Sequence, residues 1–412
     1  MGRRAWIAIL CGGGILAVIV GLRQSLGLLL PPISADLGLG RETFALGIGL
    51  MNLVWGLGAP VAGALADRHG AGRIAAAGSL LYAGGLLAMT LGGEGEQLLA
   101  GGVLLGLGLS GAGFSVVLGA VGRAAPPERL SAALGWVSVG GSIGQFLALP
   151  YTHLLIGGFG WSLSLAILAA TAVLTVPFAR GIAGAARIAP PDAAPDAPLD
   201  APAAQSLGEA VREACRHRGF RLLTAGFFVC GFHLAFVTVH LPAFLGDRGL
   251  PSWLAAAALT LVGLCNIIGT LGCGLLGQRY PKKSVLSLLY LLRALVFLAF
   301  LVVPVSEASV LAFGAAMGFL WLGTVPLTSG LVAQIFGPAY MSTLFGIVFL
   351  SHQVGGFGGA WLAGYLYDLT GSYDLMWWLS VALGFASAAL HWPIDEAPVA
   401  RLRLAPAAIP GE

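Results

Sequence analysis

Charged residues are scarce in this chain of 412 residues, and their scarcity decides its broad class. Only 9% of the residues are Asp, Glu, Lys or Arg, whereas hydrophobic types make up 58% and the mean hydropathy is +0.90. Soluble globular proteins are about one-quarter charged, because their surfaces must be solvated. The composition therefore excludes soluble enzymes, nucleic-acid-binding proteins and secreted disulfide scaffolds. It indicates an integral membrane protein.

Several motifs that would point to a particular chemistry are missing as well. The five cysteines show no paired spacing, so we expect neither disulfides nor a metal site. No GxxxxGK[ST] loop occurs, which excludes transport driven directly by ATP. An intramembrane enzyme would need clustered catalytic groups such as paired acids, and the sequence offers none. We therefore expect no cofactor and no enzymatic activity.

Long apolar runs fill most of the chain. A membrane-spanning helix needs about 20 predominantly apolar residues, and its backbone groups must be satisfied internally. The first run continues to Leu30 without a small-residue cleavage site, which indicates a retained span rather than a signal peptide. The sequence predicts an all-α membrane protein with twelve transmembrane helices. Their expected ranges are Ala5–Leu30, Phe44–Ala66, Ile74–Leu91, Gln97–Gly122, Ser131–Gly157, Trp161–Ala179, Phe220–Leu245, Trp253–Gly277, Val285–Pro304, Ala308–Ala333, Tyr340–Leu366 and Tyr373–Trp392.

The basic residues are sorted between the loops. Seventeen of the 21 Lys and Arg lie at the termini or in the even-numbered loops. The odd-numbered loops hold only Arg41 and Arg248, together with acids such as Asp36 and Asp247. Because cytoplasmic loops carry the excess of Lys and Arg, both termini are predicted to be cytoplasmic. We expect a multi-pass protein of a bacterial-type cytoplasmic (inner) membrane.

A polar segment, residues 181–219, separates the sixth predicted span from the seventh. Its first part is rich in Pro, Ala and Asp, which is typical of a flexible linker. Its second part predicts a short amphipathic helix at the cytoplasmic membrane surface, with an ordinary solvated connector helix as the alternative. The apolar face consists of Leu207, Ala210, Val211, Ala214 and Cys215. The expected parts are a six-helix half (1–180), this linker, a second six-helix half (220–393) and a tail (394–412).

The two halves match each other at one constant offset of 211 positions. Residues Leu30, Pro31, Asp36, Gly63 and Arg68 recur as Leu241, Pro242, Asp247, Gly274 and Arg279. Several matches in a single register indicate a tandem repeat of two six-helix units in the same orientation. In transporters built this way, the substrate site lies between the halves near the middle of the membrane.

Two segments carry a family resemblance. GALADRHGAGR, from Gly63 to Arg73, resembles the signature loop between the second and third spans of the major facilitator superfamily. GLLGQRYPKK, from Gly274 to Lys283, is similar to its degenerate second copy. The resemblance implies a transporter whose halves alternate in opening a central site to either side of the membrane. It also implies that the loop acid and arginines stabilise one of the two states. The residues expected in this gating role are Asp67, Arg68, Arg73 and Arg279.

A narrower resemblance concerns Gly355–Tyr373 and the stretch GLRQSLGLLLPP that begins at Gly21. Both look like segments of the bacterial branch related to monocarboxylate and oxalate/formate carriers, which implies a small organic anion as substrate. The pattern of the drug/proton antiporters matches less well, because Gly102 lies about where those proteins carry an arginine.

Only two formal charges lie well inside predicted spans, Arg23 and Arg293. A charge at the bilayer centre costs roughly 2.5–3.5 kcal/mol on insertion scales, so each is a candidate for function. No acid lies well inside a span to pair with them, and a carboxylate substrate would supply the missing partner. Arg23 lies in the first span, and we expect it to bind an anion, with a structural network as the alternative. For Arg293, in the ninth span, we favour a structural role through backbone carbonyls or snorkelling.

Other polar and aromatic residues recur at helical spacing within the spans. They either line the substrate cavity or hydrogen-bond between helices, which is common in membrane proteins. We predict that they form the substrate site together with Arg23. The residues are Asn52, Gln145, His233, His240, Asn266, Trp321, His352 and Gln353.

The sequence thus predicts a secondary active transporter of a small organic anion of the monocarboxylate type. Transport would be coupled to protons or to anion exchange, since only histidines could titrate near neutral pH within the spans. The alternative is an efflux pump for hydrophobic drug-like compounds, and a channel or a receptor is a more distant one. We expect a monomer in the lipid bilayer, with no nucleic-acid partner.

Overall fold

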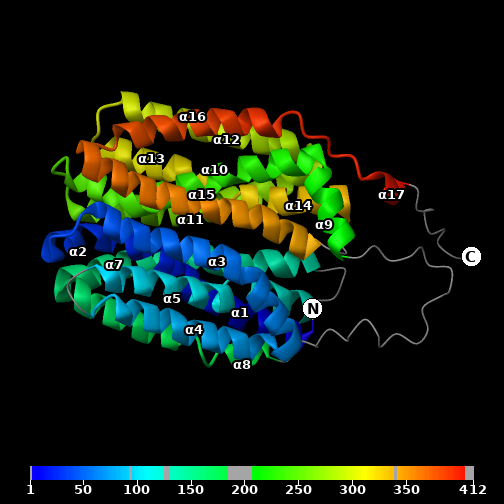
Figure 1. Cartoon of the computed structure of the whole chain (residues 1–412), viewed down its shortest axis with the longest axis horizontal. Coiled ribbons are helices and arrows are strands. Elements are labelled where there is room, and N and C mark those ends of the chain that lie inside the picture. The colour runs from blue at the N-terminus through cyan, green and yellow to red at the C-terminus, as the bar shows by residue number, and fades with distance from the viewer. Residues whose placement is uncertain (1, 92–94, 125–129, 184–206, 338–340, 404–412) are drawn as a thin grey trace, which may run out of the picture.

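A computed structural model describes residues 2–91, 95–124, 130–183, 207–337 and 341–403. All regular elements in these ranges are helices, and the long ones run along the long axis of the molecule (Figure 1). The predicted all-α class is confirmed. Nine helical stretches of the described residues are long and apolar enough to cross a membrane. The number of twelve spans and the side on which the termini lie stay predictions.

The nine stretches relate simply to the predicted spans. The fifth and sixth predicted spans lie in one continuous stretch that bends at Gly160, whose φ of 74° is a conformation that glycine adopts readily. The last two predicted spans coincide with α15 (Met341–Thr370) and α16 (Asp374–His391), which are not among the nine.

The helices up to residue 183 form the lower layer in Figure 1. The strongly apolar segments pack through small residues; Gly144 of α7, for example, leaves no room for a Cβ against Ala17 of α1. The elements are α1 (Arg3–Ser25), η1 (Leu26–Leu29), α2 (Leu30–Leu37), α3 (Arg41–His69), α4 (Ala71–Ala88), α5 (Glu96–Ala112), α6 (Phe114–Ala124), α7 (Leu130–Val173) and α8 (Ala179–Ile182).

The helices from residue 207 onward form the upper layer. Here the run predicted as the tenth span is broken between Phe319 and Thr324. Main-chain carbonyl and N–H groups at this break can therefore form hydrogen bonds with side chains in the middle of the layer. The elements are α9 (Leu207–Arg216), α10 (Arg218–Gly246), α11 (Ser252–Arg279), α12 (Lys282–Val302), α13 (Glu307–Phe319), α14 (Thr324–Phe336), α15, α16 and α17 (Ala400–Arg403).

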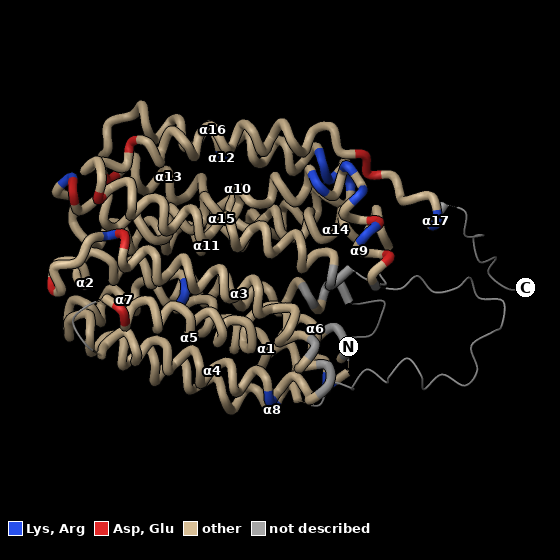
Figure 2. The backbone as a smooth tube through the Cα atoms, viewed as in Figure 1, with Lys and Arg blue, Asp and Glu red and all other residues tan. Residues whose placement is uncertain are grey.

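The two layers meet along several pairs of elements. Helix α3 packs along α15, α7 packs on α11, and both η1 and α2 pack on α10. These contacts bring the polar positions of both layers to a common interface. Charged residues gather at the two ends of the molecule, whereas the middle carries few (Figure 2). This is the distribution expected where water contacts the ends and lipid surrounds the middle.

The linker contains the predicted amphipathic helix as α9. Its buried side is formed by Ala210 and Ala214, with Val211 half-buried, and Arg401 of the tail pairs with Glu213 at 3.0 Å. Cys215, which we expected on the apolar face, is exposed instead. The side chain of Leu207 lies outside the described part of the chain.

Candidate functional site

Arg23 lies in the last turn of α1, beside Asn52 of α3, and Asn52 meets Gly356 of α15 at the interface between the layers. Its Nη1 donates to Gln24 Oε1 at 2.8 Å, and its Nη2 donates to Asn52 Oδ1 of α3 at 2.7 Å. The guanidinium carbon is 5.2 Å from the ring centroid of Trp55, within range of a cation–π interaction. All of these partners are neutral, so the positive charge is hydrogen-bonded but not neutralised by them.

Three buried donors near this interface have no hydrogen-bond partner. They are Nε of Arg23, Nε2 of Gln145 and Nε2 of Gln353. Gln145 accepts a 3.4 Å hydrogen bond from Gln24, which links α7 to the arginine. Buried polar groups are normally paired, and an unpaired one costs about 1–3 kcal/mol. A group rich in acceptor oxygens, such as a carboxylate, would satisfy them.

Helix α15 brings two more of the predicted residues to the same region. Gln353 packs against Gly56, one turn beyond Asn52, and Gly356 packs against the Asn52 amide. His352 Nδ1 lies 3.0 Å from Gln353 Oε1. The structure therefore brings Arg23, Asn52, Gln145, His352 and Gln353 together from α1, α3, α7 and α15.

Asn266 joins the layers farther along the interface. Its Nδ2 donates to Ser142 Oγ of α7 at 3.1 Å, and its Oδ1 accepts from the Leu322 N–H at 3.0 Å. Trp321 is fully buried beside this contact, and its Nε1 has no partner. Both residues thus lie at the break between α13 and α14 rather than beside Arg23.

The two span-seven histidines lie inside the upper layer. His233 is bonded through Nε2 to the Ser380 carbonyl at 2.8 Å, and its ring is 4.6 Å from that of Phe297. His240 is bonded to Tyr373 Oη at 3.0 Å and to the Ala360 carbonyl at 2.7 Å. The structure does not bring either histidine to the Arg23 cluster. Their contacts tie α10 to α15 and α16.

Arg293 is completely buried in the upper layer, not exposed at the surface that would face lipid. Its Nη2 donates to the carbonyls of Leu320 and of Trp321, the latter at 2.8 Å. Its guanidinium carbon lies 5.2 Å from the ring centroid of Tyr290. These two carbonyls follow the C-terminal end of α13, where the helix dipole is negative. Arg293 therefore stabilises the helix break, in agreement with the structural role we favoured.

Of the four predicted gating residues, two can be described. Arg73 in the first turn of α4 and Arg279 at the end of α11 are both exposed. Asp67 and Arg68 lie in the last turn of α3, but their side chains lie outside the described part of the chain.

A cluster of polar contacts at the opposite end was not predicted. Arg41 of α3 forms a bidentate ion pair with Asp247 after α10, at 2.5 and 2.7 Å, and donates to Tyr373 Oη at 3.0 Å. Asp368 of α15 accepts from the N–H groups of Arg41 and Glu42 at 3.0 and 2.8 Å, and so caps α3 from the other layer. Trp361 of α15 donates to Glu42 at 2.9 Å. We call these six residues the latch: Arg41, Glu42, Asp247, Trp361, Asp368 and Tyr373.

One sequence feature could have located the latch. Arg41 is one of only two basic residues in the odd-numbered loops, and Asp247 is the repeat counterpart of Asp36. An isolated arginine among acids predicts an ion pair. The contact joins the two layers, however, and the sequence does not state which acid it meets.

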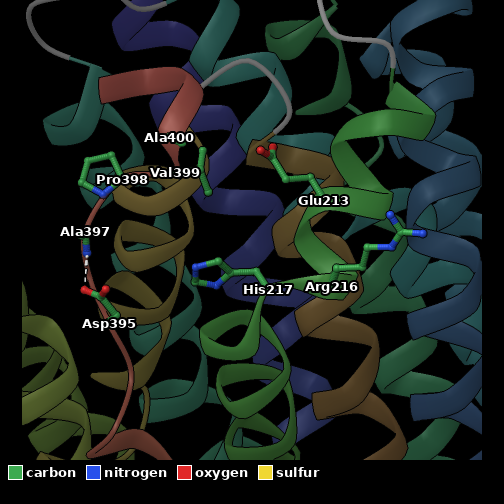
Figure 3. A pocket seen from close by; sticks show the side chains of 8 residues that line it. All are labelled: Glu213, Arg216, His217, Asp395, Ala397, Pro398, Val399 and Ala400. Atoms are coloured by element: carbon green, nitrogen blue, oxygen red, sulfur yellow. Dashed lines mark hydrogen bonds between the residues drawn. The ribbon is translucent and has the colours of Figure 1, made fainter. Parts of the chain in front are cut away.

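A surface cavity of about 400 Å³ lies at the linker end of the molecule (Figure 3). The linker residues Glu213, Arg216 and His217 line one side, and the tail segment 395–400 lines the other. Within the tail, the Ala397 N–H donates to Asp395 at 2.9 Å. This cavity is separate from the Arg23 cluster and involves none of the predicted substrate-site residues.

The sequence was compared with models of known protein families. The family model described as Major Facilitator Superfamily matches residues 9–360, and again 254–408. The chain belongs to the Major Facilitator Superfamily. It is therefore a multi-pass membrane transporter, and the relatives are transporters rather than enzymes.

Curated relatives and solved structures are similar over almost the whole chain. Monocarboxylate transporter 13 of Rattus norvegicus is 26% identical over 380 residues, which cover 90% of this chain and 84% of that protein. The predicted resemblance to the superfamily and to monocarboxylate carriers is thereby confirmed. A bacterial homolog of the human lysosomal transporter Spinster, in an inward-facing and unoccupied conformation, superposes with a TM-score of 0.71 at 16% identity, covering 95% of each chain. A D-xylose–proton symporter gives 0.69 at 17% identity, covering 95% of this chain and 97% of the other. The two structures establish the fold.

Proposed function

We propose that this member of the superfamily is a secondary active transporter of a small organic anion of the monocarboxylate type. The observation that carries the proposal is the Arg23 guanidinium, which is held by the neutral amide oxygens of Gln24 and of Asn52, the latter at the interface between the layers. A guanidinium matches a carboxylate with two parallel hydrogen bonds, which makes an organic acid its natural ligand. The name of the rat relative supports the same substrate class.

The roles of the remaining predicted site residues follow from their contacts. Arg23 would bind the carboxylate, and the free Nε2 groups of Gln145 and Gln353 would donate to its oxygens. Asn52 orients the guanidinium, and His352 orients Gln353. Asn266 and Trp321 would shape the interface at the helix break. To His233 and His240 we assign a structural role.

Alternating access would use the two ends of the interface. The latch closes the end that carries the odd-numbered loops, which we propose to be the outer side of a bacterial cytoplasmic membrane. In this state the protein would be open toward the cytoplasm. After reorientation, Asp67, Arg68, Arg73 and Arg279 would hold the inner end closed. We propose that a monomer carries out this cycle.

Coupling would follow from the anion itself. No acid lies well inside a predicted span, so a proton would travel on the substrate carboxylate or on His352, or a second anion would be exchanged. Symport and exchange differ in whether an opposing anion is required inside the vesicle.

Counterflow in proteoliposomes tests the proposal. Purified protein is reconstituted with unlabelled propionate inside, and uptake of labelled propionate is measured for the wild type, Arg23→Gln and Arg248→Gln. Arg248 is exposed and lies far from Arg23 in the sequence, so it controls for the loss of an arginine. We expect saturable counterflow in the wild type and in Arg248→Gln, and a loss of at least tenfold in Arg23→Gln. Equal counterflow in all three would refute the role of Arg23. No saturable counterflow in the wild type would refute the substrate class and favour efflux of hydrophobic compounds.

A further inference from the structure

A strip of aromatic rings begins directly beside Arg23. Trp55 contacts Phe349 edge-to-face at a centroid distance of 5.5 Å, and Phe349 stacks on His352 at 5.5 Å with an interplanar angle of 5°. Phe227 of α10 contacts His352 at 5.0 Å, and Phe345 contacts Phe349 at 6.2 Å. We call these five residues the aromatic strip. Its members come from α3, α10 and α15, so it spans both layers.

The aromatic strip differs from a second, larger ring cluster among the described residues. The second cluster lies inside the upper layer, and all its rings are almost completely buried; it comprises Phe236, Phe244, Phe297, Phe300, Phe313 and Trp377. In the aromatic strip, by contrast, Phe345 and Phe349 remain partly exposed between Trp55 on one side and Phe227 on the other. Packing alone explains the second cluster. Packing alone does not explain why Phe345 and Phe349 of the aromatic strip remain partly exposed.

Charge and aromatic surface are adjacent at one end of the aromatic strip. The Arg23 guanidinium lies 5.2 Å from the centroid of the buried Trp55 ring, and Gln145 and Gln353, whose Nε2 donors are unpaired, are buried as well. A ligand that satisfies the donors with a carboxylate would project its body along Trp55 and Phe349. Flat rings interact with such faces by edge and face contacts, which saturated chains cannot form.

We propose that the preferred substrate is an aryl monocarboxylate, whose carboxylate binds Arg23 and whose ring packs on Trp55 and Phe349. This inference rests on the proposed function, because it takes the carboxylate site at Arg23 as given. It narrows the substrate to acids in which a planar ring follows the carboxyl group directly or after one carbon. Short aliphatic acids would occupy the same site with lower affinity.

Thermal unfolding of the purified full-length chain with three ligands of similar size tests the inference. The ligands are benzoate, cyclohexanecarboxylate, which is saturated, and benzamide, which is uncharged. We expect benzoate to bind about three- to tenfold more tightly than cyclohexanecarboxylate, as aromatic pairing predicts. Trp55→Leu and Phe349→Leu should each remove most of this preference, whereas Trp55→Phe should retain it. Two independent positions are used so that poor folding of one variant leaves a second measurement.

The outcomes separate the two claims. If benzoate and cyclohexanecarboxylate bind equally to the wild type, or if the leucine variants weaken both ligands alike, the ring preference is refuted and the carboxylate site stands. If benzamide binds as tightly as benzoate, anchoring by Arg23 is refuted and the proposed function fails with it.

Discussion

Two arginines lie within the apolar part of the molecule, and they are held in opposite ways. Arg293 is fully buried in one layer and bonded through Nη2 to main-chain carbonyls at a helix end, with its Nε and Nη1 unpaired. Arg23 is bonded to two side-chain amides of the other layer, beside the interface, and its Nε is also unpaired.

The difference between the partners indicates the difference in role. Main-chain carbonyls at the end of α13 are fixed by the fold and would otherwise be unsatisfied, so Arg293 is part of the structure. Side-chain amides such as Gln24 and Asn52 can rearrange when another ligand arrives, and the interface on which they lie is the one that must move in a transporter. An arginine held in this way is suited to release and capture an anion.

The largest expected effect is on stability, at Arg293. Arg293→Met should lower the free energy of unfolding by about 2–4 kcal/mol, because two buried carbonyls lose their donor. Carboxylate affinity should be unchanged. Thermal unfolding with and without ligand measures both quantities, with Arg248→Met as control. If Arg293→Met were stable but no longer bound carboxylates, Arg293 rather than Arg23 would be the anion-binding residue.

The second effect concerns the geometry at Arg23. Arg23→Lys retains the charge but loses the planar pair of donors, so carboxylate affinity should fall by about tenfold, or 1.4 kcal/mol. Stability should change little, since no main-chain group depends on Arg23. Isothermal titration with propionate measures the affinity. Unchanged affinity would mean that charge alone, and not bidentate binding, attracts the substrate.

The third effect concerns the latch. The latch joins the two layers, whereas Arg293 makes its contacts within the upper layer. Asp247→Asn should weaken the closed state by about 1 kcal/mol, the upper range for a partly exposed ion pair. High salt should act in the same direction. Spin labels at Ala35 and Arg248, both exposed, should report a longer distance between the layers. Glu307→Gln, at an exposed acid of α13, is the control, and equal distances in both variants would contradict a latch.

The smallest effect tests the link between the two regions. Asn266 accepts from Leu322 in the break that Arg293 stabilises, and donates to Ser142 across the interface. Asn266→Ala should destabilise the protein by about 0.6 kcal/mol, the average for such interhelical bonds. In combination with Arg293→Met, the two losses should be less than additive, because both act on the same segment. Strict additivity in thermal unfolding would show that the two contacts are independent.

Much of the architecture follows from the sequence, because it depends on composition and repetition. Charge scarcity and apolar run length predict helices in a membrane, and the constant offset predicts two related units. The contrast between Arg23 and Arg293 was also predictable, because the two lie in spans of different position. What the sequence did not predict for Arg293 is its complete burial, which depends on the break between α13 and α14.

The candidate site was predictable only in part. Helical spacing tells which residues share a face, but not which neighbour that face meets. His240 and Gln353 are equally polar residues in apolar spans, yet the first bonds within one layer and the second lies at the interface. The latch escaped prediction for a related reason, since Arg41 and Asp247 are 206 residues apart and meet only when the layers assemble.

The central claim is that Arg23 binds a carboxylate, and a matched pair of ligands tests it most directly. Propionate and propionamide differ in charge but hardly in shape, and their effect on thermal unfolding can be compared in the wild type and in Arg23→Gln. The account predicts that propionate alone stabilises the wild type and that neither ligand stabilises the variant. Equal stabilisation by propionate in both proteins would contradict it.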